Sequence, residues 1–126
     1  MGFIPSADAF HLQAKAMIYR EIDQGGQKGI VFSAYNLPPD RFDAEKADVL
    51  ILLPPGYPDV PPDMFYLFPW IRLRAGGYPK AADQPFNFEN QNWQRWSRHN
   101  PEWRSGVDGI WTMLKRVDTA LQTATA

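Results

Sequence analysis

The sequence ADVLILLPPGYPDVPPDMFYLF, residues 47–68, places two apolar segments on either side of a proline-rich one. Residues 47–54 are almost continuously apolar and end in Pro, which predicts a central strand covered on both faces. Residues 54–63 contain five Pro in ten positions, so neither a helix nor a central strand can form there. We expect an ordered, extended loop over these residues, followed by a short strand over 64–68.

The segments outside this stretch predict further helices and strands. Apolar residues at helical spacing predict a helix over 7–22, with Ser6 as its N-cap and Gly25-Gly26 at its end. A β-branched and aromatic run predicts a strand over 29–37. Residues 74–92 are rich in Gly, Pro, Asn and Gln, which indicates a long irregular segment.

The C-terminal region predicts the clearest helix. Residues 105–108 resemble a capping box, and we expect the tail, residues 122–126, to fray. The predicted buried stripe follows at helical spacing and consists of Val107, Ile110, Trp111, Leu114, Val117 and Leu121.

Together these elements predict an α+β fold in a single domain, residues 1–126. We expect an antiparallel β-meander of about four strands, flanked by an N-terminal and a C-terminal helix. Twelve Pro in 126 residues, roughly twice the usual share, argue against a helical bundle.

Charge and composition exclude several classes of function. The chain has no Cys, which rules out disulfides, thiolate metal sites and a cysteine nucleophile. The net charge is −1, although residues 71–104 carry six basic and three acidic side chains. This basic segment is too short for a dedicated nucleic-acid-binding protein. No apolar run is long enough to span a membrane and no signal peptide is evident, so we expect a cytoplasmic protein that binds neither membrane nor nucleic acid.

The stretch that opens this section resembles the ubiquitin-conjugating (UBC) enzymes. Those enzymes carry a Tyr-Pro-x-x-Pro-Pro loop between two strands, and residues 57–62 match it residue for residue. The chain is more similar still to the divergent bacterial members, the prokaryotic family E proteins. That similarity lies in GYPDVPPDMFYLFPWIRL, residues 56–73, and in a Trp-x-x-Trp-Ser-Arg-His element, residues 93–99. The resemblance covers residues 30–121 and implies a UBC-like fold and a role in a bacterial ubiquitin-like conjugation pathway. The implied partners are a ubiquitin-activating-enzyme-like protein and a ubiquitin-like protein.

The chain departs from the family at the residue that carries the chemistry. UBC enzymes hold the ubiquitin-like protein as a thioester on Cys, and this chain has none. The family's His-Pro-Asn element is also missing, and its roles do not transfer to the differently ordered His99-Asn100-Pro101.

Ser97 is the candidate replacement for the Cys, because it lies near where the family places its nucleophile. A Ser hydroxyl needs a base, and His99 is two residues further on. In an extended chain, residues i and i+2 point to the same side, so the imidazole could reach the hydroxyl. A Ser introduced in place of a native Cys would give the same sequence, and the sequence leaves that alternative open.

Other residues are expected to support this site or to bind partners. Possible oxyanion or electrostatic support comes from Asn90, Asn92, Arg95 and Arg98. The residues expected at the partner surface are Tyr57, Pro61, Pro62 and Trp96, although the Pro loop and the Trp residues also have the composition of structural anchors. We expect no cofactor, and no metal site because the two His lie far apart in sequence and there is no Cys.

Two functions compete at this point. The first is an acyl carrier that accepts the ubiquitin-like protein on Ser97 as an oxyester. The second is a catalytically inactive adaptor of UBC fold that binds the ubiquitin-like protein or the activating enzyme, and the missing Cys favours it directly.

Overall fold

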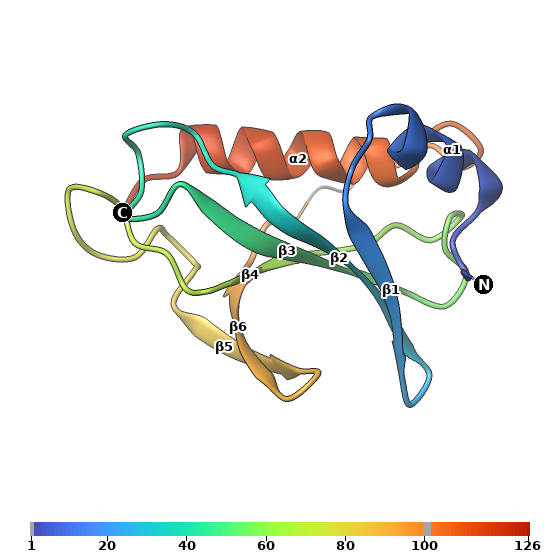
Figure 1. Ribbon diagram of the computed structural model, residues 1–126, viewed down its shortest axis with the longest axis horizontal. Helices are drawn as coiled ribbons and strands as arrows, with labels where there is room; N and C mark the ends of the chain where they lie inside the picture. The colour runs from blue at the N-terminus through green and yellow to red at the C-terminus, as the bar shows by residue number, and fades with distance from the viewer. Residues whose placement is uncertain (1, 100–101) are drawn as a thin grey trace.

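A six-stranded antiparallel sheet forms the body of the protein (Figure 1). The computed structural model describes residues 2–99 and 102–126. The strands lie in the order β1-β2-β3-β4-β6-β5, which confirms the α+β class. In chain order the elements are α1 (Ser6–Ala14), β1 (Tyr19–Gln24), β2 (Gln27–Asn36), β3 (Lys46–Leu53), β4 (Phe65–Phe68), β5 (Gln84–Phe88), β6 (Gln91–Trp96) and α2 (Ile110–Thr123).

The three strands that were predicted, β2, β3 and β4, are neighbours in the middle of the sheet. β3 is covered on both faces, as its apolar run predicts. Val49 and Ile51 are buried in the larger core beneath α2, whereas Leu50 points to a second cluster on the other face. The hairpin of β5 and β6 supplies Phe88 and Trp93 to that second cluster.

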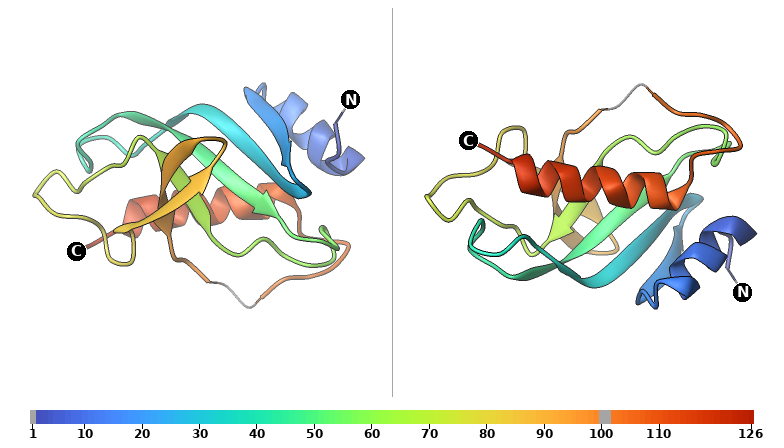
Figure 2. Two further views of the ribbon diagram at one scale, coloured as in Figure 1. Left: turned by 90° about the horizontal axis from the view of Figure 1, so that it is seen from below. Right: turned by 90° about the horizontal axis from the view of Figure 1, so that it is seen from above.

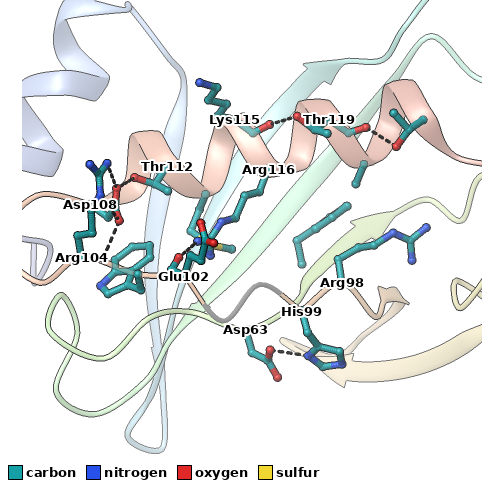
Figure 3. A pocket seen from close by; sticks show the side chains of 15 residues that line it. Asp63, Arg98, His99, Glu102, Arg104, Asp108, Thr112, Lys115, Arg116 and Thr119 are labelled. Carbon is teal, nitrogen blue, oxygen red and sulfur yellow. Dashed lines mark hydrogen bonds and ion pairs between the residues drawn. The ribbon is translucent and has the colours of Figure 1, made fainter.

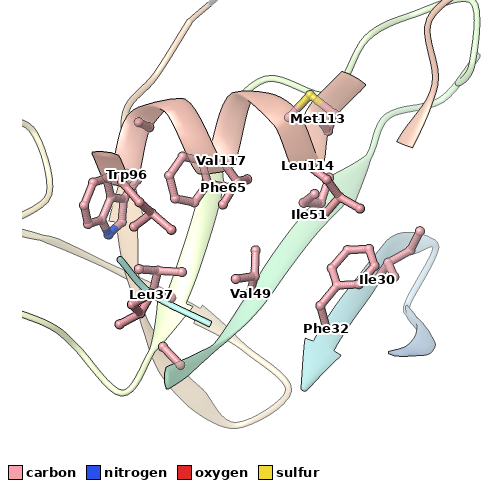
Figure 4. Close-up of a cluster of buried hydrophobic side chains, with 14 of the residues drawn as sticks. Ile30, Phe32, Leu37, Val49, Ile51, Phe65, Trp96, Met113, Leu114 and Val117 are labelled. Carbon is pink, nitrogen blue, oxygen red and sulfur yellow. The ribbon is translucent and has the colours of Figure 1, made fainter. Parts of the chain in front are cut away.

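The helix α2 lies across one face of the sheet, and its apolar stripe forms the centre of the larger core (Figures 1 and 2). Figure 4 shows Met113, Leu114 and Val117 facing the side chains of Ile51 and Phe65. The helix begins at Ile110, later than predicted, because residues 105–107 form a turn. The expectation for Val107 is therefore wrong, since this residue is 54% exposed.

The predicted helix over 7–22 is wrong in its second half. α1 ends at Ala14, and β1 begins at Tyr19 and pairs with β2. Gly25 and Gly26 have φ of 61° and 91° and join the two strands as a two-residue hairpin loop. Such a loop requires positive φ at both positions, so the Gly pair is a hairpin signal and not a helix end. Ser6 forms no side-chain cap, because the helix already begins at this residue.

The irregular segment predicted over 74–92 contains most of a second hairpin, so the sheet has more strands than expected. β5 and β6 are joined by Glu89 and Asn90, both with positive φ (57° and 58°). Trp93 and Trp96 therefore belong to a strand and not to a loop. Being three residues apart they lie on opposite faces, one in each hydrophobic cluster, and both are fully buried.

The C-terminal tail is held in place, contrary to the expectation that it frays. Arg41 donates hydrogen bonds to the carbonyl oxygens of Leu121 (3.0 Å) and Ala124 (2.6 Å). The carbonyl of Thr125 accepts a hydrogen bond of 2.7 Å from the backbone N–H of Lys80. These partners are distant in sequence, so a local pattern could not reveal them. Within the described residues, no helix combines the length and apolar character needed to cross a bilayer.

Candidate functional site

A long groove lies between α2 and the segment that follows β6 (Figure 3). Its volume is about 970 Å³, and we call it the α2 groove. Phe65, Trp103, Met113 and Ala120 supply apolar lining. Its charged lining residues are Asp63, Arg98, His99, Glu102, Arg104, Asp108, Lys115 and Arg116. An apolar groove with a charged rim can hold an extended peptide through its side chains and its backbone.

His99 forms a hydrogen bond with Asp63 at the edge of this groove. The distance between His99 Nδ1 and Asp63 Oδ1 is 2.7 Å, and both side chains are about two-thirds exposed, at 63% and 62%. Because an ionised carboxylate only accepts hydrogen bonds, the proton in this bond lies on Nδ1. Asp63, at the end of the Pro loop, therefore orients the imidazole.

Ser97 is the first residue after β6 and is half-buried. Its backbone N–H donates to the carbonyl of Ala81 (3.0 Å), and its hydroxyl donates to the sulfur of Met64 (3.6 Å). In the part of the chain that the structure describes, no hydrogen bond joins Ser97 to His99. The contact between Ser97 and His99 was predicted from the alternation of side chains along an extended strand. That alternation ends with β6, because residues 97–99 are no longer part of the sheet.

Ser97 opens onto a second, smaller cavity of about 270 Å³. We call it the Lys80–Arg98 pocket; its lining residues are Lys80, Ser97, Arg98, Thr123, Ala124 and Thr125. Lys80 and Arg98 are thus the titratable residues that line a cavity together with Ser97. The sequence offered no signal for this, because Lys80 and Ser97 are 17 positions apart and lie on either side of the β5–β6 hairpin.

Arg98 lies between the two cavities and lines both. Its guanidinium donates to the carbonyl oxygens of Lys80 (2.9 Å) and Ser97 (3.1 Å) and lies 5.0 Å from the centre of the Trp96 ring. Burial lowers the pKa of Arg98 below its ordinary value. The guanidinium of Arg98 thus contacts the backbone carbonyl of Ser97, and its electrostatic role at the hydroxyl stays a prediction.

The other three residues expected to support Ser97 do not contact it. Asn90 is in the turn of the β5–β6 hairpin and Asn92 is exposed near the start of β6. At about 3.3 Å per strand residue, they are separated from Ser97 by roughly 15–25 Å. Arg95 lies opposite Tyr66 in the sheet, and its Nε is buried without a hydrogen-bond partner. Within the described residues, no hydrogen bond joins any of the three to Ser97.

The residues expected at a partner surface are mostly structural. Trp96 is fully buried and stacks on Phe65 with a ring distance of 5.3 Å, and Pro62 is also buried, so neither offers a contact surface. The hydroxyl of Tyr57 donates to the buried carboxylate of Asp8 (2.6 Å). Pro61 is half-buried beside this loop. The Pro loop is therefore fixed to the body of the protein, as its composition also suggested.

The sequence analysis did not identify two residues of the site. Asp63, which orients His99, is the last residue of the Pro loop before β4. The feature that could have revealed it is a polar side chain at the end of a loop whose position is fixed. Gln94 is fully buried between the two Trp residues of β6 and bonds to the segment that carries Lys80. Of the string His99-Asn100-Pro101 noted in the sequence, the last two positions lie outside the residues that the structure describes.

Asp108, at the other end of the groove, gives the stability of the protein a dependence on acid pH. Its carboxylate accepts hydrogen bonds from the Arg104 guanidinium (3.2 Å), from the Arg104 backbone N–H (2.7 Å) and from the Thr112 hydroxyl (3.0 Å). These bonds, the one from the Arg104 side chain above all, lower the pKa of Asp108 from 3.8 to about 2. A lowered carboxyl pKa stabilises the fold at higher pH, and this contribution is lost as the pH falls from ~4 toward ~2.

We therefore expect the stability difference between the wild type and the Asp108→Asn variant to be constant above pH ~5 and to shrink between pH ~4 and ~2. Urea denaturation at a series of pH values measures this difference. Asp40→Asn, at a side chain that is 90% exposed, is the matched control and should follow the wild-type profile. A stability difference for Asp108→Asn that does not change with pH would contradict the expectation.

No cluster of three or more His, Cys, Asp or Glu side chains that could hold a metal ion occurs within residues 2–99 and 102–126.

Comparison with known proteins gives one match. The model of a family described as prokaryotic E2 family E matches residues 4–124, which is nearly the whole chain. The matched range contains every strand of the sheet, every described lining residue of the α2 groove and all lining residues of the Lys80–Arg98 pocket except Thr125. No curated protein and no solved structure matched the chain.

Proposed function

The chain belongs to prokaryotic E2 family E, and on that premise we propose that it is a non-covalent adaptor of a bacterial ubiquitin-like conjugation pathway. Family membership makes it a UBC-like protein of a conjugation pathway. The general partners of such proteins are an activating-enzyme-like protein and a ubiquitin-like protein. The finer proposal is that this protein binds the ubiquitin-like protein in the cytoplasm without holding it as an ester on its own side chain.

The observation that supports this proposal is the set of contacts around Ser97, the candidate nucleophile. The chain has no Cys, and the Ser97 hydroxyl donates to the Met64 sulfur. His99, the expected base, is held by Asp63 in the other cavity. A Ser hydroxyl is a weak nucleophile unless a base removes its proton, so this arrangement supports binding over acyl transfer.

One observation favours a second candidate, a carrier that holds the ubiquitin-like protein on Ser97. Lys80 lines the same pocket as Ser97, and a lysine amine can serve as the base in a Ser-Lys pair. In this candidate the Ser97 hydroxyl attacks the activated carboxyl of the ubiquitin-like protein. It then forms an ester, releases the activating group and passes its proton to Lys80. His99 has no part in this step.

Reconstitution with the activating enzyme, ATP and the ubiquitin-like protein distinguishes the two candidates. We expect saturable binding of the ubiquitin-like protein by calorimetry, with or without ATP. Intact-mass spectrometry should detect no adduct that dilute hydroxide cleaves. Ser97→Ala should bind as the wild type does. Its matched control is Ser33→Ala, at an exposed Ser on β2.

An ester adduct changes this conclusion. Its mass would be that of the two proteins less one water, it would be cleaved by hydroxide, and it would be absent in Ser97→Ala but present in Ser33→Ala. That result would replace the adaptor with the Ser97 carrier. Absence of both binding and adduct would contradict both candidates.

A further inference from the structure

Two arginines and two aromatic residues lie together on the segment between β4 and β5. We call them the Arg72 platform, which consists of Trp70, Arg72, Arg74 and Tyr78. The Arg72 guanidinium lies over the Tyr78 ring, 4.7 Å from its centre, and donates to the Tyr78 hydroxyl (3.3 Å). The Trp70 and Tyr78 rings meet edge to face, with their centres 5.7 Å apart. Trp, Tyr and Arg are the residues that most often contribute the binding energy of protein interfaces.

The segment that carries the platform, residues 70–78, lies at the end of the molecule opposite α1 (Figures 1 and 2). None of the four platform residues lines the α2 groove or the Lys80–Arg98 pocket. Arg72 is exposed, whereas Trp70 and Tyr78 are half-buried. A partner that binds the platform would therefore leave both cavities and α1 accessible.

The platform is held in place before any partner binds. The Trp70 indole N–H donates to the carbonyl of Asn92 (2.9 Å). The backbone N–H of Arg72 donates to the Asp43 carboxylate (2.9 Å), and the Arg72 carbonyl accepts from the Asp43 N–H (3.0 Å). The turn over residues 73–77 is closed by two backbone hydrogen bonds of its own. Groups that are already fixed lose little entropy when a partner binds, so this rigidity favours binding.

The platform carries positive charge without a strong counter-ion. Residues 64–82 contain three cations and no Asp or Glu. In the described part of the chain, Arg72 forms no ion pair with a carboxylate. Asp43 contacts the Arg72 backbone, and Asp40 lies 3.4 Å from the Arg74 guanidinium in a pair whose two side chains are strongly exposed. Exposed pairs of this kind are weak, so a carboxylate from a partner can replace Asp40.

The two arginines are spaced like alternate residues of an extended strand. Leu73, between them, forms an isolated antiparallel bridge with Phe42 and packs against the larger core. Arg72 and Arg74 therefore point to the opposite side, away from the core. Alternate residues of an extended chain are roughly 7 Å apart, so two carboxylates at positions i and i+2 of an extended peptide match this spacing.

These features favour a peptide over a nucleic acid. A single strand binds by stacking its bases on free aromatic faces, and one face of Tyr78 is already covered by Arg72. The net charge of the chain is −1, which also argues against a nucleic acid. A guanidinium that lies flat on an aromatic ring keeps the N–H donors at its edge available, and these match the two oxygens of a carboxylate.

We propose that the Arg72 platform binds an acidic segment of a partner protein, whose carboxylates at positions i and i+2 face Arg72 and Arg74. The segment lies extended along residues 72–74 and places an apolar side chain against the exposed part of Trp70. This surface is additional to the one that binds the ubiquitin-like protein in the proposed adaptor function, and it does not depend on that function.

The probe is the synthetic peptide N-acetyl-Leu-Ser-Glu-Ser-Glu-Ser-amide, and its control has Gln in place of both Glu. In an NMR titration, the Glu peptide should shift the Trp70 indole N–H and the backbone resonances of residues 72, 74 and 78 until they saturate. The Gln peptide should bind roughly tenfold or more weakly, because the charge-assisted hydrogen bonds are lost. Raising the salt concentration from about 0.05 M to about 0.5 M should weaken binding of the Glu peptide and leave that of the Gln peptide nearly unchanged.

Two substitutions at Arg72 test whether its guanidinium is recognised. Arg72→Ala should lower the affinity for the Glu peptide roughly tenfold or more, and Arg72→Lys should lose most of the same affinity. Lys keeps the charge but lacks the planar fork that lies on the Tyr78 ring and pairs with a carboxylate. Both changes are at an exposed side chain, so the variants should fold as the wild type does. Lys15→Ala is the matched control, since it removes an equal charge from an exposed residue just after α1, and it should leave the affinity unchanged.

Equal binding of the two peptides would show that carboxylates are not recognised, and equal losses in Lys15→Ala and Arg72→Ala would show that only net charge matters. Either result would overturn the proposal. An oligothymidine of about ten nucleotides is the probe for the alternative occupant. If it shifts the platform resonances at a lower concentration than the Glu peptide does, the surface binds single-stranded nucleic acid and the proposal is wrong. The adaptor function stands or falls separately, by calorimetry with the ubiquitin-like protein.

Discussion

Replacing Gln94 with Leu is expected to lower the free energy of unfolding by roughly 3–5 kcal/mol, because Leu cannot form the hydrogen bonds of the buried amide. Gln94 is fully buried in β6 and uses both ends of its amide. Its Nε2 donates to the carbonyl oxygens of Ile71 (2.9 Å) and Ala82 (2.8 Å). Its Oε1 accepts from the Ile71 N–H (3.0 Å) and from the Trp96 indole N–H (3.2 Å). A Leu of similar size fills the space but leaves four buried polar groups unpaired, at ~1–3 kcal/mol each before relaxation.

The matched control is Gln91→Leu in the same strand. The Gln91 side-chain oxygen is buried without a hydrogen-bond partner, so this substitution should change stability by less than ~1 kcal/mol, or increase it slightly. Chemical denaturation of the two variants measures the difference. Equal losses of stability in the two variants would show that the side-chain hydrogen bonds of Gln94 contribute nothing to stability beyond the volume of the side chain.

The parts of the fold that could be predicted are those whose signals are local. The signals that predict β3 and the Pro loop each lie within ten residues of sequence. Both elements occur where they were predicted. The β5–β6 hairpin was missed because its Asn, Gln and Pro residues have loop-like composition. What stabilises it is the burial of Phe88 and Trp93 against the far face of the sheet, a contact that is not visible in a local pattern.

Part of the site could also be predicted, because part of its signal is local in sequence. The basic character around Ser97 and the family resemblance could both be read from residues 93–99. The pairing of Ser97 with His99 assumed that an extended strand continues through both, whereas β6 ends at Trp96. Asp63, which bonds to His99, and Lys80, which lines a cavity with Ser97, come from loops whose positions depend on the whole fold.

The second large effect is expected at Asp8, where three elements meet. Its carboxylate is 1% exposed and accepts hydrogen bonds from the Tyr57 hydroxyl (2.6 Å) and from the backbone N–H of Ile110 (3.2 Å). It thereby joins α1 to the Pro loop and to the first turn of α2, where the helix dipole favours a negative charge. We expect Asp8→Ala to lower the free energy of unfolding by roughly 2–4 kcal/mol, because it leaves a buried hydroxyl and a buried N–H without acceptors.

Two further variants separate the contributions of the Asp8 partners. Asp8→Asn retains an acceptor oxygen and should cost less than Asp8→Ala. Tyr57→Phe removes only one bond and should cost about 1 kcal/mol. In Asp8→Ala/Tyr57→Phe the Tyr57 loss should largely disappear, since its acceptor is already gone, and a double-mutant cycle measures this coupling. Additive losses would contradict a direct Asp8–Tyr57 contribution.

The same contact predicts a loss of stability at alkaline pH. Burial, followed by the hydrogen bond to Asp8, raises the pKa of Tyr57 above its ordinary value of 10.0. A raised pKa means that the folded state retains a proton which the unfolded state releases, so the stability from Tyr57 is fully present below pH ~10 and declines as the pH rises further. Tyr35 and Tyr66 also have raised pKa values, so the wild type should lose stability steeply above pH ~10 and Tyr57→Phe less steeply. Urea denaturation between pH 8 and 11 tests this, and identical slopes for the two proteins would place the alkaline sensitivity at Tyr35 and Tyr66 and not at the Asp8 contact.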